Sequence, residues 1–460
     1  MKNPKKFDAI VIGAGQAGIP LAKKLASSGK SVAIIEKRII GGTCINDGCS
    51  PTKTMIFSAR VAHLARNGKN WGVETDHLKI NYDTALKLKN NIVESFRNGA
   101  IKGLEKTPNL HIIMGEASFI DNETMLIKNG QEETEIKGEL IFINTGCTPY
   151  IPEIEGIKET EYLTSTTLLD LEEIPKHLVI VGGGYIALEF GQMMSRFGSK
   201  VTILEKSKTL LPHEDEDVCT SISDVFKQEG IEIHTNADVI RVEGKKEKTV
   251  TAEINGKNHT FSCSHILIAS GRAPQTKNLR LSFAGVDTDE KGYVKVDDKL
   301  KTSAKNIYAL GDVKGGPAFT HISYNDFVIV SKNILQNGDM TTKGRALPYC
   351  MFTDPQLGRV GISEKEAKEK GINYKVAKLP MKYVARALET GETNGFMKAI
   401  VDPETKMILG ATVIGAEGGE IMSILQIAML GNITYEQIRY NIFAHPLYAE
   451  SLNNLFMSLD

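Results

Sequence analysis

The stretch that decides the fold is Phe7–Gly18, FDAIVIGAGQAG, which continues through a helix-like segment into residues 32–36, VAIIE. Its apolar start is typical of a buried strand and runs directly into Gly13-x-Gly15-x-x-Gly18. Glycines at this spacing permit a tight turn and let a pyrophosphate approach the start of a helix. Glu36 ends the second apolar segment, where a carboxylate binds a ribose diol. The stretch therefore predicts a strand–helix–strand unit that binds a dinucleotide.

The same pattern occurs a second time at residues 178–206, LVIVGGGYIALEFGQMMSRFGSKVTILEK. An ungapped offset of 169 positions places Gly13 on Gly182, Gly15 on Gly184 and Glu36 on Glu205. Ala187 stands at the third glycine position, which is a tolerated variant. Two dinucleotides are therefore implied. Glu205 would repel a 2′-phosphate and favours NADH, whereas Lys206 and Lys208 leave NADPH open.

Residues 41–53, GGTCINDGCSPTK, contain two cysteines five positions apart. A helix is expected from Cys49 onward, because Pro51 fits its first turn and apolar residues recur at helical spacing within residues 54–66. The helix N-terminus, with Lys53 one turn on, favours a thiolate at Cys49. A structural disulfide or two unrelated buried thiols are the alternatives. Both fit poorly, since so short a loop adds little stability and a large chain needs no such link.

Bulk properties fit a large enzyme. The length of 460 residues suggests about three domains, and the net charge of −1 gives no case for nucleic acid or an anionic membrane surface. The sequence shows neither a secretory leader pattern nor an apolar run that would span a bilayer, so a cytoplasmic location is expected. No metal site is expected, because the other four cysteines lack ligand spacing: Cys147, Cys219, Cys263 and Cys350.

Apolar periodicity outlines the remaining elements. We expect helices at 81–106 and 419–430 and strands at 111–119, 139–144, 266–268, 306–310, 398–401 and 408–414. The strand at 306–310 is followed by Gly311-Asp312. This pair either offers a carboxylate to a sugar-like hydroxyl or is an ordinary strand end.

Taken together, these motifs resemble the flavoprotein disulfide reductases of the pyridine nucleotide type, the group containing dihydrolipoamide dehydrogenase, glutathione reductase and mercuric reductase. The motifs that carry the resemblance are the two fingerprints, the CxxxxC segment, Thr145-Gly146, ASGR at 269–272, YALGD at 308–312, and His445-Pro446 with Glu450. The resemblance implies an α/β fold with two doubly wound nucleotide-binding domains and an α+β dimerisation domain. The implied boundaries are an FAD-binding domain at 1–150, an NAD(P)-binding domain at 151–275, a return to the FAD-binding or central domain at 276–343, and dimerisation at 344–460.

The resemblance also implies roles for individual residues. Cys49 would be the thiolate beside the flavin and Cys44 the thiol that attacks substrate. Lys53 and Glu189 would pair beside the reactive flavin nitrogen. His445, held by Glu450, would be the acid–base group and would reach the active site of the other subunit of a homodimer. The remaining implied cofactor positions are Gly18, Thr43, Ala117, Thr145, Gly146, Gly271, Arg272 and, on the flavin's ribityl chain, Asp312.

The substrate is less defined. Thr52, TDPQ at 353–356 and ARAL at 385–388 resemble mercuric reductases, but the chain has neither their C-terminal cysteine pair nor an N-terminal metal-binding module, and His445 replaces their usual tyrosine. We therefore expect an NADH-linked, FAD-dependent enzyme that passes electrons through Cys44–Cys49 to a small disulfide or dithiol. The alternatives are reduction of a soft metal ion such as Hg(II) or Cu(II) by the same thiolates, and a non-catalytic redox-sensing or lipoyl-complex-binding flavoprotein.

Asp47 departs from the family pattern, which has an apolar residue between the cysteines. A carboxylate there would raise the pKa of both thiols and discourage anionic substrates. Asp47-Gly48 is also a good turn dipeptide whose side chain binds local backbone N–H groups. Both interpretations stay open at the level of sequence.

Overall fold

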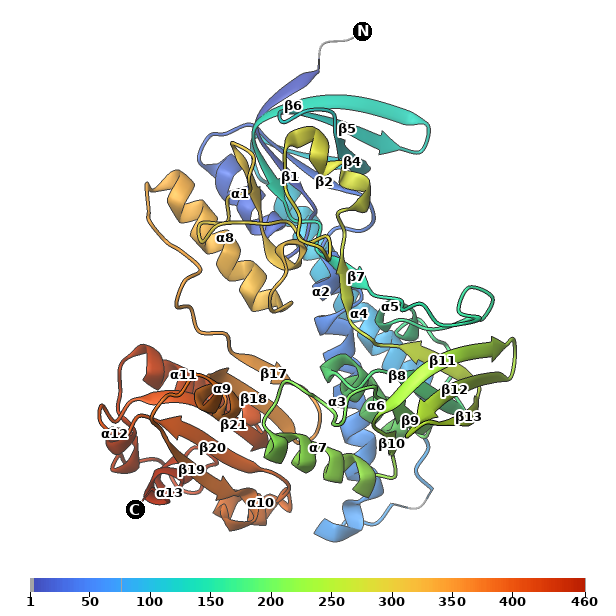
Figure 1. Cartoon of the computed structure of the whole chain (residues 1–460), viewed down its shortest axis with the longest axis vertical. Helices are drawn as coiled ribbons and strands as arrows, with labels where there is room; N and C mark the ends of the chain where they lie inside the picture. The colour runs from blue at the N-terminus through green and yellow to red at the C-terminus, as the bar shows by residue number, and fades with distance from the viewer. Residues whose placement is uncertain (1–3, 76, 460) are drawn as a thin grey trace. The chain divides into compact units, whose positions relative to one another are not determined.

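The structure is a computed structural model that describes residues 4–75 and 77–459. The chain divides into two compact units, each assembled from separate stretches of sequence. The first unit combines the described residues up to Thr54 with Asp83–Tyr150 and Gly271–Arg345. The second combines Met55–Tyr82 and Ile151–Ser270 with the described residues from Ala346 onward. Figure 1 labels the elements of both units.

A seven-stranded sheet forms the centre of the first unit. Its strands are β1 (Lys5–Ile12), β2 (Val32–Glu36), β3 (Leu110–Met114), β4 (Glu116–Phe119), β5 (Thr124–Asn129), β6 (Glu132–Ile143) and β16 (Ile307–Ala309). The order is β3-β2-β1-β6-β5-β4, with β16 paired to β6. Strands β3, β2, β1, β6 and β16 run parallel, whereas β4, β5 and β6 form an antiparallel meander. The parallel part has the arrangement of a doubly wound nucleotide-binding fold.

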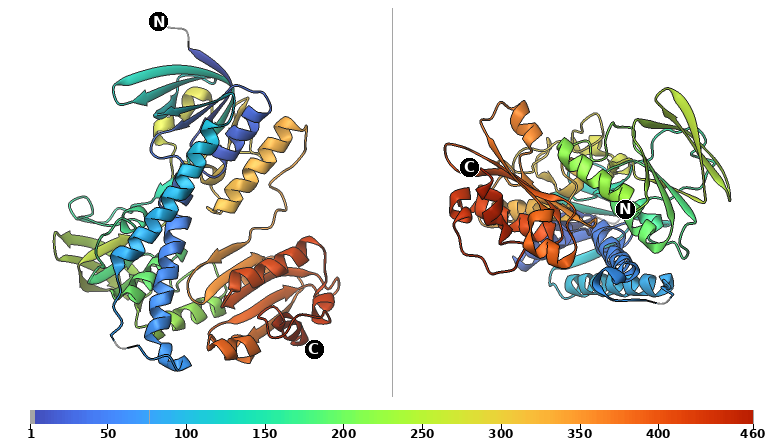
Figure 2. Two further views of the ribbon diagram at one scale, coloured as in Figure 1. Left: turned by 180° about the vertical axis from the view of Figure 1, so that it is seen from behind. Right: turned by 90° about the horizontal axis from the view of Figure 1, so that it is seen from below.

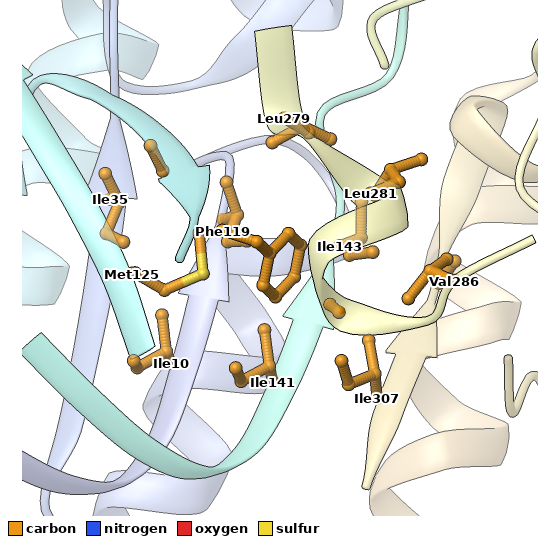
Figure 3. Close-up of a cluster of buried hydrophobic side chains, with 14 of the residues drawn as sticks. Ile10, Ile35, Phe119, Met125, Ile141, Ile143, Leu279, Leu281, Val286 and Ile307 are labelled. Carbon is orange, nitrogen blue, oxygen red and sulfur yellow. The ribbon is translucent and has the colours of Figure 1, made fainter. Parts of the chain in front are cut away.

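Helices α1 (Gly18–Ser27) and α8 (Thr320–Leu335) lie together on one face of this sheet, as Figure 2 shows. Leu21 and Val330 from these helices cluster there with Val11 of β1. Side chains alternate between the faces of a strand, so Ile10 points to the opposite face and joins a second cluster with Phe119 (Figure 3). That cluster is closed by η2 (Lys277–Leu279) and η3 (Leu281–Ala284). Burial on both faces explains why β1 is continuously apolar from Ala9 to Ile12.

The other elements of the first unit are short or extend beyond it. They are α2 (Gly42–Asn46), β7 (Cys147–Pro149), β15 (Arg272–Pro274) and η4 (Gly311–Lys314). Strands β7 and β15 pair antiparallel. Two long helices, α3 (Cys49–Arg66) and α4 (Tyr82–Glu105), contribute residues to both units.

The second unit contains the repeated nucleotide fold. Its parallel sheet has the order β10-β9-β8-β14, and an antiparallel sheet of β11, β12 and β13 follows. The bounds are β8 (His177–Val181), β9 (Lys200–Leu204), β10 (Glu232–His234), β11 (Ala237–Gly244), β12 (Lys248–Ile254), β13 (Lys257–Cys263), β14 (His265–Ile268), α5 (Ser165–Leu168), α6 (Tyr185–Phe197) and α7 (Glu216–Gln228). Ala9 pairs with Val32 in the first sheet, and Leu178 pairs with Val201 in the second. The two copies therefore share their strand register at the offset of 169 residues.

The C-terminal part of the second unit is α+β. An antiparallel sheet runs β17-β18-β21-β20-β19, and α11 packs on β18 and β21, as Figure 1 shows. The bounds are β17 (Tyr349–Met351), β18 (Gln356–Gly361), β19 (Lys375–Pro380), β20 (Phe396–Val401), β21 (Ile408–Gly415), α9 (Glu364–Glu369), α10 (Ala385–Thr390), α11 (Gly418–Leu430), α12 (Tyr435–Arg439), α13 (Ser451–Met457) and η5 (Met381–Tyr383). The short η1 (Gly68–Trp71) also belongs to the second unit and follows α3 in the sequence.

The α/β fold class with two nucleotide units and an α+β C-terminal part is confirmed. The helix expected from Cys49 is α3, the helix expected at 81–106 is α4, and the helix expected at 419–430 is α11. The segment at 111–119 is interrupted at Gly115, which has a φ of 152° and separates β3 from β4. The antiparallel sheet at 237–263 had no counterpart in the expected elements. The domain boundaries stay a prediction.

Candidate active site and nucleotide-binding sites

In the first glycine loop, two of the three glycines have no room for a side chain and the middle one does. Gly13 has a φ of 105°, and a Cβ there would lie 2.3 Å from the carbonyl oxygen of Asn144 at the end of β6. A Cβ on Gly18 would lie 2.1 Å from the Gly13 carbonyl oxygen. At Gly15 the nearest atom would be the Asn144 amide nitrogen, at 3.4 Å. Packing therefore requires glycine at Gly13 and Gly18. Gly15, between them, leaves its backbone accessible, as a bound pyrophosphate requires.

The second glycine loop repeats this arrangement. Gly182 has a φ of 114°, and a Cβ there would lie 2.6 Å from the Ala269 carbonyl oxygen. A Cβ on Gly184 would meet no atom within 4 Å. The loop leads into α6, whose first residue is Tyr185. Each copy therefore offers exposed backbone at a helix N-terminus, and both cradles fit a dinucleotide phosphate.

Glu36 and Glu205 hold their loops in the same way. Glu36 accepts hydrogen bonds from the backbone N–H groups of Ala14 and Arg38, each at 2.9 Å. Glu205 accepts from Gly183 at 2.5 Å and Ser207 at 2.6 Å. These partners are equivalent at the offset of 169. Because a carboxylate has about four lone-pair positions, each acid can hold the glycine turn and still accept from a ribose hydroxyl.

The CxxxxC segment packs directly against the first glycine loop. The Gly41 N–H donates to the Ala14 carbonyl oxygen at 2.9 Å. A Cβ on Gly42 would lie 2.8 Å from the Cα of Gly15. Thr43 follows in α2, and its carbonyl oxygen accepts the Asp47 N–H at 3.0 Å. The segment that carries the two cysteines is therefore in direct contact with the glycine loop.

Cys44 lies in α2 and Cys49 is the first residue of α3, and the two are not joined by a disulfide. The Cys49 Sγ lies 3.4 Å from Thr320 Oγ1, in the first turn of α8. The neighbouring Cys49 and burial raise the pKa of Cys44, while Thr320 and Lys53 act to lower it. The resemblance implies that Cys44 is the exposed thiol that attacks substrate. In the single chain Cys44 is half-buried and Cys49 is exposed, so this exposure is wrong for the chain by itself.

Asp312 lies in η4, directly after β16. Burial raises the pKa of its carboxyl group, and the positive charges of Arg272 and Lys314 oppose this. Asp326 holds the turn, since its carboxylate accepts the Gly311 N–H at 2.9 Å and pairs with Arg345 at 2.7 Å. A carboxylate held in this way is suited to accept a hydroxyl group.

The strand ends around Asp312 are joined by side chains from the predicted motifs. Arg272 Nη2 donates to the Cys147 carbonyl oxygen at 2.7 Å, in the β7–β15 pair that Gly271 precedes. Thr145 Oγ1 donates to the Gln275 carbonyl oxygen at 2.9 Å, and Gly146 accepts the Gln275 N–H at 2.9 Å. Ala117 of β4 is buried in the apolar cluster that contains Ile10 and Phe119. The cofactor contacts assigned to these residues stay predictions.

Two residues of this region were missed in the sequence. Asn144 donates through Nδ2 to the Gly13 carbonyl oxygen at 3.1 Å, and a Cβ on Gly311 would lie 3.2 Å from its Oδ1. For Asn144, the signal in the sequence was a polar side chain at the carboxyl end of a strand expected in the parallel sheet, where ligands bind in such folds. Thr320 is brought to Cys49 only by tertiary folding, and no local pattern marks it.

The second unit holds the remaining catalytic candidates. Glu189 is buried in α6, and its Oε1 accepts the Phe352 N–H at 2.8 Å. His445 Nδ1 lies 2.9 Å from Glu450 Oε2, and the histidine side chain is 68% exposed. Lys53 belongs to the first unit and Glu189 to the second. The Lys53–Glu189 pair and the acid–base role of His445 therefore stay predictions.

The described part of the chain shows neither a metal-binding cluster nor a membrane-spanning helix. Residues 4–75 and 77–459 contain no group of three or more His, Cys, Asp and Glu side chains suited to hold a metal ion. No helix in this part of the chain combines the length and apolar character that crossing a membrane requires.

Sequence profiles assign the chain to a family. The profile described as "Pyridine nucleotide-disulphide oxidoreductase" matches residues 7–326, and that of the corresponding dimerisation domain matches residues 347–456. The chain belongs to the pyridine nucleotide-disulphide oxidoreductases. The resemblance seen in the motifs is confirmed, and the matches account for both nucleotide units and the C-terminal part of this oxidoreductase.

Known relatives cover the whole chain. The probable pyridine nucleotide-disulfide oxidoreductase RclA of Escherichia coli (strain K12) is 40% identical over 98% of this chain and 99% of that protein. A mercuric reductase of Staphylococcus aureus is 34% identical over 99% of this chain and 82% of its own length. The dihydrolipoyl dehydrogenase of Bacillus subtilis (strain 168) is 34% identical over 97% of this chain and 95% of its own.

A solved structure gives the same result. The Cu(II) complex of the HOCl-induced flavoprotein disulfide reductase RclA from Escherichia coli matches with a TM-score of 0.90 at 39% identity, over 99% of this chain and 100% of that chain. This oxidoreductase is therefore an enzyme of the FAD- and NAD(P)H-dependent disulfide oxidoreductase type. Its dimerisation domain belongs to a family that forms homodimers.

Proposed function

We propose that this oxidoreductase passes electrons from NADH through FAD to the Cys44–Cys49 pair, and from there to a small disulfide substrate. The observation that carries the proposal is the dithiol segment built onto the first glycine loop, with Gly42 against Gly15. A dinucleotide bound in that cradle would contact the segment that carries the two thiols. The absence of a secretory pattern among the six cysteines supports action in the cytoplasm, where thiols stay reduced.

Several side chains are suited to hold FAD in the first unit. The loop from Gly13 to Gly18 would bind the pyrophosphate, Glu36 a ribose, and Asp312 the ribityl chain. When bound, FAD supplies two-electron transfer between the nicotinamide and the protein disulfide. Lys53 and Glu189 are proposed to pair beside it.

The two thiols are proposed to have different roles. Cys49, at the start of α3 and 3.4 Å from the Thr320 hydroxyl, is the thiolate that faces the flavin. Cys44 keeps its proton beside that thiolate and attacks the substrate disulfide once it is deprotonated. The mixed disulfide is then resolved by Cys49, which regenerates the Cys44–Cys49 disulfide and releases the second substrate thiol.

NADH is the proposed nucleotide, in preference to NADPH. Both oxygens of Glu205 are held at the end of β9, so the acid is fixed where a 2′-phosphate would lie. Lys206, which would be a phosphate ligand, pairs instead with Asp238 at 2.8 Å. Binding a 2′-phosphate would require Lys206 to leave Asp238 and approach a phosphate beside Glu205.

We infer that the active sites are shared across the homodimer, with His445 serving the dithiol of the partner subunit. The His445–Glu450 pair is exposed in the single chain. The C-terminal part also exposes large apolar side chains: Ile427, Leu430, Tyr440, Ile442 and Leu447. A surface of this kind is normally covered by a protein partner. His445 would then supply and remove protons at the partner's Cys44 and at the leaving thiol.

A soft metal ion is the second candidate substrate. Mercuric reductases are among the relatives, and the matched RclA structure is a Cu(II) complex. Two adjacent thiolates would bind such an ion directly.

The test is a panel of steady-state assays on the purified holoenzyme with lipoamide, glutathione disulfide, Hg(II) and Cu(II) as acceptors and NADH as donor. Turnover with a disulfide, lost in Cys44→Ser, supports the proposal. Turnover with only the metal ions supports the second candidate. NADH reduction of the flavin without reoxidation by any of these acceptors would contradict both and favour a non-catalytic flavoprotein.

A further inference from the structure

Asp47, between the two cysteines, forms an ion pair with Arg38. Arg38 Nη1 lies 2.6 Å from Asp47 Oδ2. The carboxylate is buried, with 9% of its side chain exposed, whereas the Arg38 side chain is 48% exposed. Asp47 follows the last residue of α2, so it terminates the short helix that carries Cys44. Neither interpretation from the sequence included a cationic partner for this carboxylate.

Arg38 is itself fixed to the nucleotide fold. Its backbone N–H donates to Glu36 Oε1 at 2.9 Å, and the other oxygen of Glu36 accepts the Ala14 N–H. The guanidinium is therefore presented from the turn after β2, which is held to the first glycine loop. The ion pair joins this turn to the segment between the cysteines.

A second arginine holds the same segment through a neutral partner. Arg97 Nε donates to Asn46 Oδ1 at 2.7 Å, and Asn46 Nδ2 donates to the Gly42 carbonyl oxygen at 2.9 Å. The backbone of α2 is thus anchored independently of Asp47. Removing the charge of Asp47 or Arg38 should therefore change the electrostatics of the dithiol more than its geometry.

The effect of Asp47 on the dithiol depends on whether Arg38 is paired with it. A buried carboxylate without a cation is costly and disfavours another negative charge close by. Reduction of the pair breaks the Sγ–Sγ bond and consumes two electrons and one proton, giving a Cys44 thiol and a Cys49 thiolate. The reduced state therefore gains a negative charge within the segment that contains Asp47. The positive charge of Arg38 offsets the negative charge of the Asp47 carboxylate.

We propose that Arg38 is a positioning residue of the redox centre: by neutralising Asp47 it stabilises the reduced dithiol and so sets the potential of the Cys44–Cys49 couple. The inference rests on the proposed function only in that this pair is the redox centre. It holds for either candidate substrate. It also explains how a carboxylate is tolerated between the cysteines.

The test compares the midpoint potential of the dithiol couple in Arg38→Gln, Asp47→Asn and the double variant. Each holoenzyme is titrated anaerobically with dithionite in the presence of a redox indicator dye, and the charge-transfer absorbance is recorded. Arg38→Gln should lower the potential and Asp47→Asn should raise it. Each single change should alter the equilibrium constant by about threefold to tenfold, which is about 15–30 mV for a two-electron couple. The double variant should return close to wild type.

Two controls separate charge from structure. Lys37→Gln removes a neighbouring cation of equal exposure, 48%, which pairs with Glu116 and not with Asp47. It should leave the potential unchanged, and Arg38→Lys should restore most of the Arg38→Gln shift. Shifts of the same sign in both single variants, or no shift in either, would overturn the inference. A wild-type holoenzyme without any dithiol-dependent charge-transfer band would overturn the proposed function as well.

Discussion

Thr320 Oγ1 lies 3.4 Å from Cys49 Sγ, so the first turn of α8 meets the first turn of α3 within the first unit. Both helices direct their N-terminal backbone N–H groups toward the dithiol. Two helix N-termini and a hydroxyl donor favour a thiolate at this point. The fold thus supplies the electrostatic environment that the CxxxxC segment needs, and it does so with a residue 271 positions away in the sequence.

Replacing Thr320 by valine should raise the apparent pKa of the reduced dithiol. The hydroxyl lies 3.4 Å from Cys49 Sγ, so its loss makes a thiolate at Cys49 more costly. We expect an upward shift on the order of half a pKa unit, about 0.7 kcal/mol. The measurement is a pH titration of the charge-transfer absorbance of the two-electron-reduced enzyme. Thr320→Ser keeps the hydroxyl and should titrate like wild type; a Thr320→Val enzyme that titrates like Thr320→Ser would remove Thr320 from the account.

The preference for NADH should depend on Glu205 and on the pairing of Lys206. Glu205→Ala combined with Lys206→Arg should narrow the NADH to NADPH ratio of kcat/KM by about tenfold or reverse it, because a like charge beside the 2′-phosphate is removed and a cation is added. Asp238→Ala should raise activity with NADPH while leaving Glu205 in place, since it frees Lys206. Equal kcat/KM for both nucleotides in the wild-type enzyme would show that Lys206 or Lys208 already binds the phosphate.

His445→Ala should separate the two half-reactions. Flavin reduction by NADH should be nearly unchanged, because that step needs no proton from the C-terminal part. Reoxidation by a disulfide should slow by a factor of roughly 10² or more, the usual scale of general acid–base catalysis. Stopped-flow absorbance measures both steps.

The sharing of His445 between subunits is tested by complementation. A heterodimer of a Cys44→Ser chain with a His445→Ala chain should regain one working site if His445 serves the partner's dithiol. Heterodimers without activity would place His445 outside the partner's active site. Each homodimer of a single variant is the control and should be inactive or nearly so with disulfides.

Lys398 should be a major source of stability in the second unit. Its ammonium group is buried and pairs with Asp215 at 2.8 Å, Asp217 at 2.9 Å and Glu364 at 3.2 Å. Lys398→Met leaves these carboxylates without their shared cation and should cost about 3–5 kcal/mol in the free energy of unfolding. Lys378, which is 40% exposed and also pairs with Asp217, is the matched control. Lys378→Met should cost about 1 kcal/mol or less. Denaturant unfolding measures both free energies, and equal losses in Lys398→Met and Lys378→Met would contradict this assignment.

The repeated nucleotide fold was predictable because its signals are local and occur twice. Gly13 and Gly182 are required by the same close approach to a strand end, and Glu36 and Glu205 accept equivalent backbone hydrogen bonds. The start of α3 at Cys49 was also visible, since helix-starting residues and apolar spacing agree there. Patterns within about thirty residues were sufficient for these elements.

The residues that were missed act over long sequence separations. Thr320 and Asn144 reach the dithiol and the glycine loop only after the sheet has formed. Arg38 looks like an ordinary exposed cation in the sequence, and only its 2.6 Å pair with Asp47 gives it a role. The ion pair gives Asp47 a cationic partner nine positions away, which neither interpretation from the sequence included.

The central claim is that Cys49 is the thiolate beside the flavin and Cys44 the thiol that reacts with substrate. The most direct test is the visible spectrum of the holoenzyme after anaerobic addition of NADH, recorded for wild type, Cys49→Ser and Cys44→Ser. The account predicts a long-wavelength charge-transfer band in wild type and in Cys44→Ser, no band in Cys49→Ser, and loss of disulfide turnover in both variants. A band that persists in Cys49→Ser and disappears in Cys44→Ser would contradict it.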